Sequence, residues 1–135
     1  MDPLRPVRRL TGVYHADGGL RGELAYVVGK ALGRAHCALC DVTHSPVRRK
    51  REWDAYVSAL GVPFDLVHLN ERSPAVAAAT GMATPAVLAH VPGAGPAEDL
   101  VVVLGPADLD TVGGDVAGFG AALGRALGRA GLALP

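Results

Sequence analysis

The sequence predicts an α/β domain in which a mixed sheet of about four strands is flanked by helices. Its 135 residues are half hydrophobic and 19% charged, which gives enough apolar surface for the core of one domain and excludes a disordered chain. Segments of strand and of helical character alternate along the chain, an order typical of a largely parallel sheet covered on both faces. A loop of hairpin length joins the last two strand segments, so we expect those two to pair antiparallel.

In the first half of the chain, we expect one strand and two helices around an unassigned segment. A strand over residues 10–15 ends in the turn residues Asp17-Gly18-Gly19. Apolar residues then recur at helical spacing over residues 20–33, which predicts a helix. Ser45-Pro46 has the form of an N-cap followed by proline at the first helical position, so a second helix is expected from there to Gly61.

The second half is expected to supply three strands and two helices. Strands are predicted over residues 64–69, 85–91 and 100–104, the last being a continuous apolar run bounded by turn residues. Ser73-Pro74 again has the form of an N-cap followed by proline, and it predicts a short helix that ends before Gly81. A final helix is predicted from an apolar stripe that consists of Val116, Phe119, Leu123, Leu127 and Ala130.

Charge and hydropathy exclude several classes of protein. Lys plus Arg and Asp plus Glu number 13 each, and a net charge of zero argues against binding to nucleic acid. No uncharged apolar run reaches the length of about 18 residues that a membrane helix needs, and none follows the basic N-terminal residues. We therefore expect a cytoplasmic protein with no membrane partner and no signal peptide. Gly120, Gly124 and Gly128 recur on one helix face, which could pack closely against a second copy in a homodimer.

The only two cysteines, Cys37 and Cys40, form a C-x-x-C motif that lies between His36 and His44. A lone C-x-x-C in a reducing compartment is typical of redox-active or metal-binding sites rather than of structural disulfides. In the redox interpretation, Cys37 is the nucleophilic thiolate and Cys40 resolves its mixed disulfide.

Charged residues near the motif would adjust its chemistry. Arg48 and Arg49 lie in a basic run of four residues, which we expect at the start of the following helix. Positive charge there would lower the pKa of Cys37. Asp41 directly follows Cys40, where a c-type haem motif requires histidine, so haem attachment is excluded.

The same cluster supports a second interpretation, in which Cys37, Cys40 and His44 bind copper, as Cu(I), or zinc, as Zn(II). The C-x2-C-x3-H spacing fits chelation, and His36 or His15 could supply a further ligand. A distant second pair of ligands is lacking, so the pattern is not that of a zinc finger. In a third interpretation, the cysteines are only small apolar side chains buried beneath a loop.

His15 and Asp17 lie at the carboxyl end of the first predicted strand, the edge at which α/β folds place ligands. His15 could act there as a metal ligand or as a general base, and Asp17 could orient it. In the alternative, Asp17-Gly18-Gly19 is no more than a turn.

Over residues 37–104 the order of motifs resembles the thioredoxin-like superfamily. The C-x-x-C precedes a helix, an apolar strand follows, and Gly81-Met82-Ala83-Thr84-Pro85 leads into the next strand. The resemblance implies a single thioredoxin-like domain over residues 1–135, in which a cis proline, Pro85, preceded by Thr84, faces the cysteines. One feature departs from the family pattern, because the helix predicted over residues 20–33 separates the first strand from the C-x-x-C.

The sequence therefore predicts a small cytosolic thioredoxin-like protein that carries out thiol–disulfide or related thiol chemistry with Cys37 and Cys40. As an enzyme it would be a thiol–disulfide oxidoreductase whose partner is a protein or small-molecule thiol or disulfide. The alternative is a metal-binding protein, either a copper or zinc carrier or a metal-dependent enzyme, that uses Cys37, Cys40 and His44. A third alternative is a non-catalytic interaction module on the same scaffold.

Overall fold

A mixed sheet of four strands forms the centre of the computed structural model, which describes residues 4–17, 37–45 and 48–135. The strands β2 (Arg9–Val13), β5 (Phe64–Val67), β6 (Ala86–Pro92) and β7 (Glu98–Leu104) lie side by side in the order β5-β2-β6-β7. β5 is parallel to β2, whereas β6 is antiparallel to β2 and β7 is antiparallel to β6. The predicted α/β class with a mixed four-stranded sheet is confirmed, as is the antiparallel pairing of β6 with β7.

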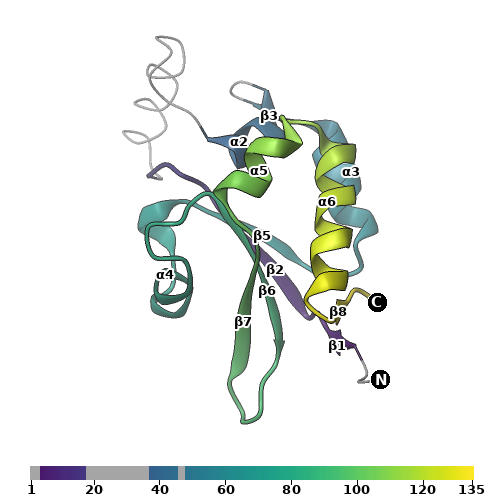
Figure 1. The fold of residues 1–135 in the computed structure, drawn as a ribbon. Helices are drawn as coiled ribbons and strands as arrows, with labels where there is room; N and C mark the ends of the chain where they lie inside the picture. Colours follow the sequence, from purple (N-terminus) through teal and green to yellow (C-terminus); the bar gives the residue numbers. More distant parts are fainter. Residues whose placement is uncertain (1–3, 18–36, 46–47) are drawn as a thin grey trace.

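Helices cover the two faces of this sheet unequally (Figure 1). The described residues form five α-helices: α2 (Ala38–Thr43), α3 (Arg51–Ala59), α4 (Pro74–Thr80), α5 (Pro106–Val112) and α6 (Val116–Arg129). A large core packs α2, α3, α5 and α6 against one face, and α4 contributes Val76 to a small cluster on the other. Successive side chains of a strand point to opposite faces of the sheet. In β6, Val87 and Ala89 accordingly pack in the large core, and Leu88 packs in the small cluster on the other face.

Four aromatic rings join α3, β5 and α6 within the large core. Trp53 has only 2% of its surface exposed, and its ring lies edge-on to those of Phe64 and Phe119 at centroid distances of 5.0 and 5.3 Å. Tyr56 contacts the ring of Phe119 at 5.8 Å. Gly120 permits this packing, since a Cβ there would lie 3.0 Å from Cε2 of Tyr56. Gly120, one of the three glycines predicted to face a second copy, thus lies against Tyr56 of its own chain.

The short helix α4 begins and ends where the sequence predicts. The Ser73 hydroxyl accepts a hydrogen bond from the N–H of Val76 at 3.2 Å, and Pro74 occupies the first helical position. Gly81 follows the helix with a φ of 53°, a conformation that glycine adopts at little cost.

The prediction that Ser45 caps the helix after the cysteines is wrong. His44–Ser45 (β3) and Arg48–Arg49 (β4) instead form a small antiparallel hairpin. Because paired strands need extended backbone, the helix cannot start until this hairpin ends. α3 therefore begins at Arg51, with Lys50 as its N-cap, and the two preceding arginines lie in a strand rather than in the first helical turn.

Two further features have weak sequence signals. α5 begins after Gly105, its N-cap, with Pro106 at the first helical position, as in α4. The Asp108 carboxylate accepts a hydrogen bond from the N–H of Gly105 at 2.9 Å. β1 (Arg5–Pro6) pairs in parallel with β8 (Leu132–Ala133), and strands of two residues are too short to show a periodicity. The helix predicted over residues 20–33 lies outside the described residues.

α6 buries the stripe that the sequence predicts, apart from its last member. Ala130 is the C-cap residue that follows the helix, and it is exposed. With 14 residues, α6 is the longest of the described helices, and none of these is both long and apolar enough to cross a membrane. The remaining members of the stripe are buried, namely Val116, Phe119, Leu123 and Leu127.

Gly12 lies where β2 passes close to its neighbours, so replacing it should destabilise the fold. A Cβ there would lie 3.0 Å from a side-chain atom of each of three residues, Leu39, Phe64 and Leu66. We expect Gly12→Ala to lower the free energy of unfolding by about 1–3 kcal/mol through overpacking, as measured by urea denaturation. Gly124→Ala is the matched control, because a Cβ there meets nothing within 4 Å. Alanine should stabilise that helix by roughly 0.5–1 kcal/mol, and equal effects of the two substitutions would contradict this packing.

Candidate functional site

One edge of the sheet brings together the end of β2 and the segment that precedes β6. The last residue of β2 pairs with the first residue of β6, so His15 and Thr84 lie at the same edge. His15 Nδ1 lies 2.8 Å from Thr84 Oγ1, and the backbone N–H of His15 donates to the Cys37 sulfur at 3.3 Å. The Thr84-Pro85 peptide bond is cis, as the resemblance implies. The C-x-x-C motif therefore meets the sheet at the edge where α/β folds place ligands.

Cys37 is the N-cap of α2, and its sulfur accepts two backbone hydrogen bonds. The N–H of Cys40 donates to it at 3.3 Å from the first turn of the helix. The N–H of His15 donates at 3.3 Å from the end of β2. The sulfur also shares a hydrogen bond with the side chain of Cys40. The two cysteines of the motif are thus directly coupled to one another and to the sheet.

Hydrogen bonds lower the pKa of Cys37 from 9.0 to about 7. The bond with the Cys40 side chain lowers the pKa most, and burial of the thiol opposes it. The N–H groups of His15 and Cys40 lower the pKa further, whereas the negative charge of Asp41 raises it. The fraction of Cys37 that carries a negative charge at neutral pH is therefore larger than that of an ordinary cysteine.

The described side chains of the basic run at the start of α3 do not supply this stabilisation. Lys50 donates from Nζ to the carbonyl of Gly114 at 2.8 Å, and Arg51 is exposed. The side chains of Arg48 and Arg49 lie outside what the structure describes. The described donors to the sulfur are a thiol and two backbone N–H groups rather than cations.

The two cysteines differ in their accessibility. Cys37 is 0% exposed and belongs to the large core, whereas Cys40 is half-buried and packs against that core. No disulfide joins them. The cysteine with the lowered pKa is therefore enclosed, and its neighbour in the motif is the one that solvent reaches.

Tyr14 and Thr43 contribute two buried hydroxyl groups that the sequence motifs do not indicate. Tyr14 Oη lies 2.7 Å from Thr43 Oγ1, which in turn lies 2.7 Å from Nδ1 of His44. The Tyr14 ring also lies 5.1 Å from the ring of His68. The sequence signal that could have identified Tyr14 is its position at the end of a strand, directly before His15.

The described residues do not assemble the predicted metal site. Among them, no group of three or more His, Cys, Asp or Glu side chains is placed to hold an ion. Nδ1 of His44 is bonded to Thr43, and Nδ1 of His15 is bonded to Thr84. His36, the remaining ligand of that prediction, lies outside the described residues. Metal chelation by this cluster therefore has no geometric support in the part of the chain that is described.

His68 and His90 make their hydrogen bonds with residues other than the cysteines, and Asp17 does not orient His15 as predicted. Asp17 is exposed, and Thr84 rather than Asp17 is bonded to Nδ1 of His15. Glu71 accepts the backbone N–H of His68 at 2.7 Å and lies 2.6 Å from its ring Nδ1, and these bonds lower the pKa of Glu71. His90 Nε2 lies 2.8 Å from a threonine hydroxyl of β2. His68 and His90 are thus satisfied by local partners.

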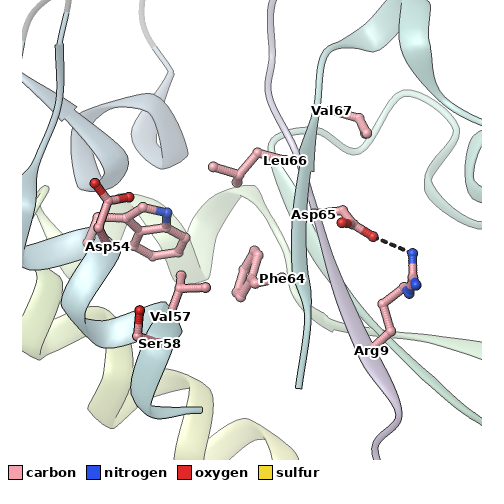
Figure 2. Close-up of a pocket in the computed structure, with 9 residues that line it drawn as sticks. Arg9, Asp54, Val57, Ser58, Phe64, Asp65, Leu66 and Val67 are labelled. Atoms are coloured by element: carbon pink, nitrogen blue, oxygen red, sulfur yellow. Dashed lines mark hydrogen bonds and ion pairs between the residues drawn. The ribbon is translucent and has the colours of Figure 1, made fainter. Parts of the chain in front are cut away.

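A separate groove of about 740 Å³ lies between α3 and the edge strand β5 (Figure 2). Trp53 and Val57 line it from the helix, and Phe64 lines it from the strand. Arg9 and Asp65 form an ion pair of 2.7 Å at its border. No cysteine lines this groove, so it is distinct from the C-x-x-C site.

Comparison with known proteins yields no assignment. No protein-family model, no curated protein and no solved structure matches this chain. The geometry of the cysteine pair is therefore the basis on which a function can be proposed.

Replacing Cys40 should change the pKa of Cys37 according to whether the new side chain can donate a hydrogen bond. In Cys40→Ala the largest lowering contribution is lost, so the pKa of Cys37 should rise from about 7 toward 9.0. In Cys40→Ser the hydroxyl can still donate, so the pKa should stay closer to 7. Each variant has a single thiol, whose ultraviolet thiolate absorbance against pH gives its pKa directly. Identical pKa values in the two variants would show that this bond does not control the charge of Cys37.

Proposed function

We propose that this chain carries out thiol–disulfide exchange with the Cys37–Cys40 pair. The observation that carries the proposal is the environment of the Cys37 sulfur, which accepts N–H bonds from His15 and Cys40. The thiolate is the reactive form in disulfide exchange, and donors that stabilise the anion increase its fraction at neutral pH. Together with the side chain of Cys40, these donors lower the pKa of Cys37 to about 7, which increases the fraction of the protein that carries the thiolate at neutral pH.

Membership in the thioredoxin-like superfamily is part of this proposal. The C-x-x-C lies at the start of α2, and β5 and α4 follow along the chain. The cis Thr84-Pro85 peptide then leads into the antiparallel pair of β6 and β7. This is the order of elements on which the resemblance rests. In such a setting, Pro85 would hold the backbone of a partner beside the cysteines.

The proposed reaction transfers two electrons between the cysteine pair and a partner disulfide. In the reduced state, the thiolate of Cys37 and the thiol of Cys40 hold one proton between them. Reaction with a disulfide RSSR forms the Cys37–Cys40 bond and breaks the S–S bond of the partner, which leaves as one thiolate and one thiol. The reverse reaction oxidises two partner thiols. In the reducing cytoplasm that the sequence leads us to expect, the pair would rest in its dithiol form.

Oxidation of the purified protein tests this function. After incubation of the folded protein with glutathione disulfide, we expect the chain to lose the mass of two hydrogen atoms and to lose both titratable thiols. The expected reason is that the two cysteines are neighbours in the first turn of α2, where the N–H of Cys40 already donates to the Cys37 sulfur at 3.3 Å. Intact mass spectrometry and thiol titration under denaturing conditions measure these changes.

The double variant Cys37→Ala/Cys40→Ala is the control and should show neither change. A dithiol reductant should restore the original mass and both thiols. A chain that keeps both thiols and its original mass after this treatment would refute the proposed function.

A further inference from the structure

The unequal burial of the two cysteines bears on the order of the exchange reaction. Disulfide exchange requires the attacking sulfur to come into line with the S–S bond of the partner, so that sulfur must be reachable from outside. Cys37 has no exposed surface and belongs to the large core, whereas Cys40 is half-buried at the border of that core. Of the two, Cys40 is the residue with surface exposed to a partner in this fold.

The hydrogen bonds around Cys37 point to the same assignment. Its sulfur is enclosed by the end of β2, through the N–H of His15, and by the first turn of α2, through the N–H of Cys40. The ring of His15, an exposed residue, is itself hydrogen-bonded to Thr84. Such an arrangement suits a sulfur that must hold a negative charge inside the protein, rather than one that meets a partner at the surface.

Resting on the proposed thiol–disulfide exchange, we infer that Cys40 is the sulfur that bonds to the partner and that Cys37 is the internal sulfur that displaces it. This order is the reverse of the one that the sequence predicts, in which Cys37 attacks and Cys40 resolves. Exposure of Cys40 and enclosure of Cys37 by backbone donors are the observations that support the reversal.

The first half of the reaction takes place at Cys40. Its sulfur attacks one sulfur of the partner disulfide RSSR, and its proton passes to the neighbouring sulfur of Cys37. A bond forms between Cys40 and the RS group, the S–S bond of the partner breaks, and the other RS group leaves as a thiolate. The product is a mixed disulfide on Cys40 beside a protonated Cys37.

The second half of the reaction takes place between the two cysteines. Cys37 first gives its proton to the RS⁻ thiolate released in the first half. The Cys37 thiolate then attacks the sulfur of Cys40. The internal disulfide forms, the bond between Cys40 and the second RS group breaks, and that group leaves as a thiolate. In the reverse direction, a partner thiolate attacks Cys40 and Cys37 leaves. Its N–H donors then make it a good leaving group, because a stabilised thiolate departs faster.

The test compares Cys37→Ser with Cys40→Ser, since each variant keeps one sulfur and can form only a mixed disulfide. The folded variants are incubated with glutathione disulfide at pH 7, and intact mass spectrometry follows the gain of one glutathionyl group. In Cys37→Ser, solvent takes the Cys40 proton in place of Cys37. We still expect this variant to form the adduct at least about tenfold faster than Cys40→Ser, because the Cys37 sulfur that Cys40→Ser retains is enclosed even though its pKa stays closer to 7. In guanidinium chloride the two rates should become nearly equal, because burial no longer separates the two sulfurs.

A second measurement on the wild-type protein covers the case in which a variant does not fold. A brief pulse of glutathione disulfide is stopped with acid, and fragmentation of the peptide that contains both cysteines locates the glutathionyl group, which we expect on Cys40. Faster reaction of Cys40→Ser, or a glutathionyl group on Cys37, would overturn the inference. The proposed function would survive that result as long as the wild-type chain still forms its internal disulfide. Absence of that disulfide would refute the function itself.

Discussion

The proposed chemistry and the attachment of α2 to the sheet both depend on hydrogen bonds that meet at the buried sulfur of Cys37. One donor is the N–H of His15 after β2, and another is the N–H of Cys40 in the first turn of α2. A polar group without exposed surface costs stability unless such partners are present. The same bonds therefore link the start of the helix, whose apolar side chains pack in the large core, to the sheet edge, and they stabilise the negative charge that thiol exchange needs.

The topology of the sheet is what brings these groups together. Because β6 runs antiparallel to β2, the end of one strand and the start of the other share an edge. His15 lies at this edge. Its ring is hydrogen-bonded to Thr84 before β6, and its backbone N–H donates a hydrogen bond to the sulfur of Cys37 at the start of α2. The link from the Cys37 sulfur through His15 to Thr84 thus follows from strand pairing over long sequence distances.

Signals that are local in the chain predicted their elements well, and long-range contacts explain what they missed. Ser73-Pro74 predicted the start of α4, and apolar runs predicted β6 and β7. Ser45-Pro46 carries the same local helix signal, but pairing of β3 with β4 overrides it. At the site, C-x-x-C spacing identified the cysteine pair, and the resemblance to the thioredoxin-like superfamily predicted the cis bond at Thr84-Pro85. The burial of Cys37 and its backbone donors could not be predicted, because they arise from packing and from N–H groups that almost every residue has.

An NMR titration of the reduced protein tests the central claim most directly. The ¹³Cβ chemical shift of Cys37 reports ionisation of its sulfur, and the amide shift of Cys40 reports the hydrogen bond to that sulfur. We predict that both change together with a midpoint near pH 7, because one of the donors to the ionising sulfur is this amide. Titration of Cys37 near pH 9.0, with no matching change at the Cys40 amide, would contradict the account.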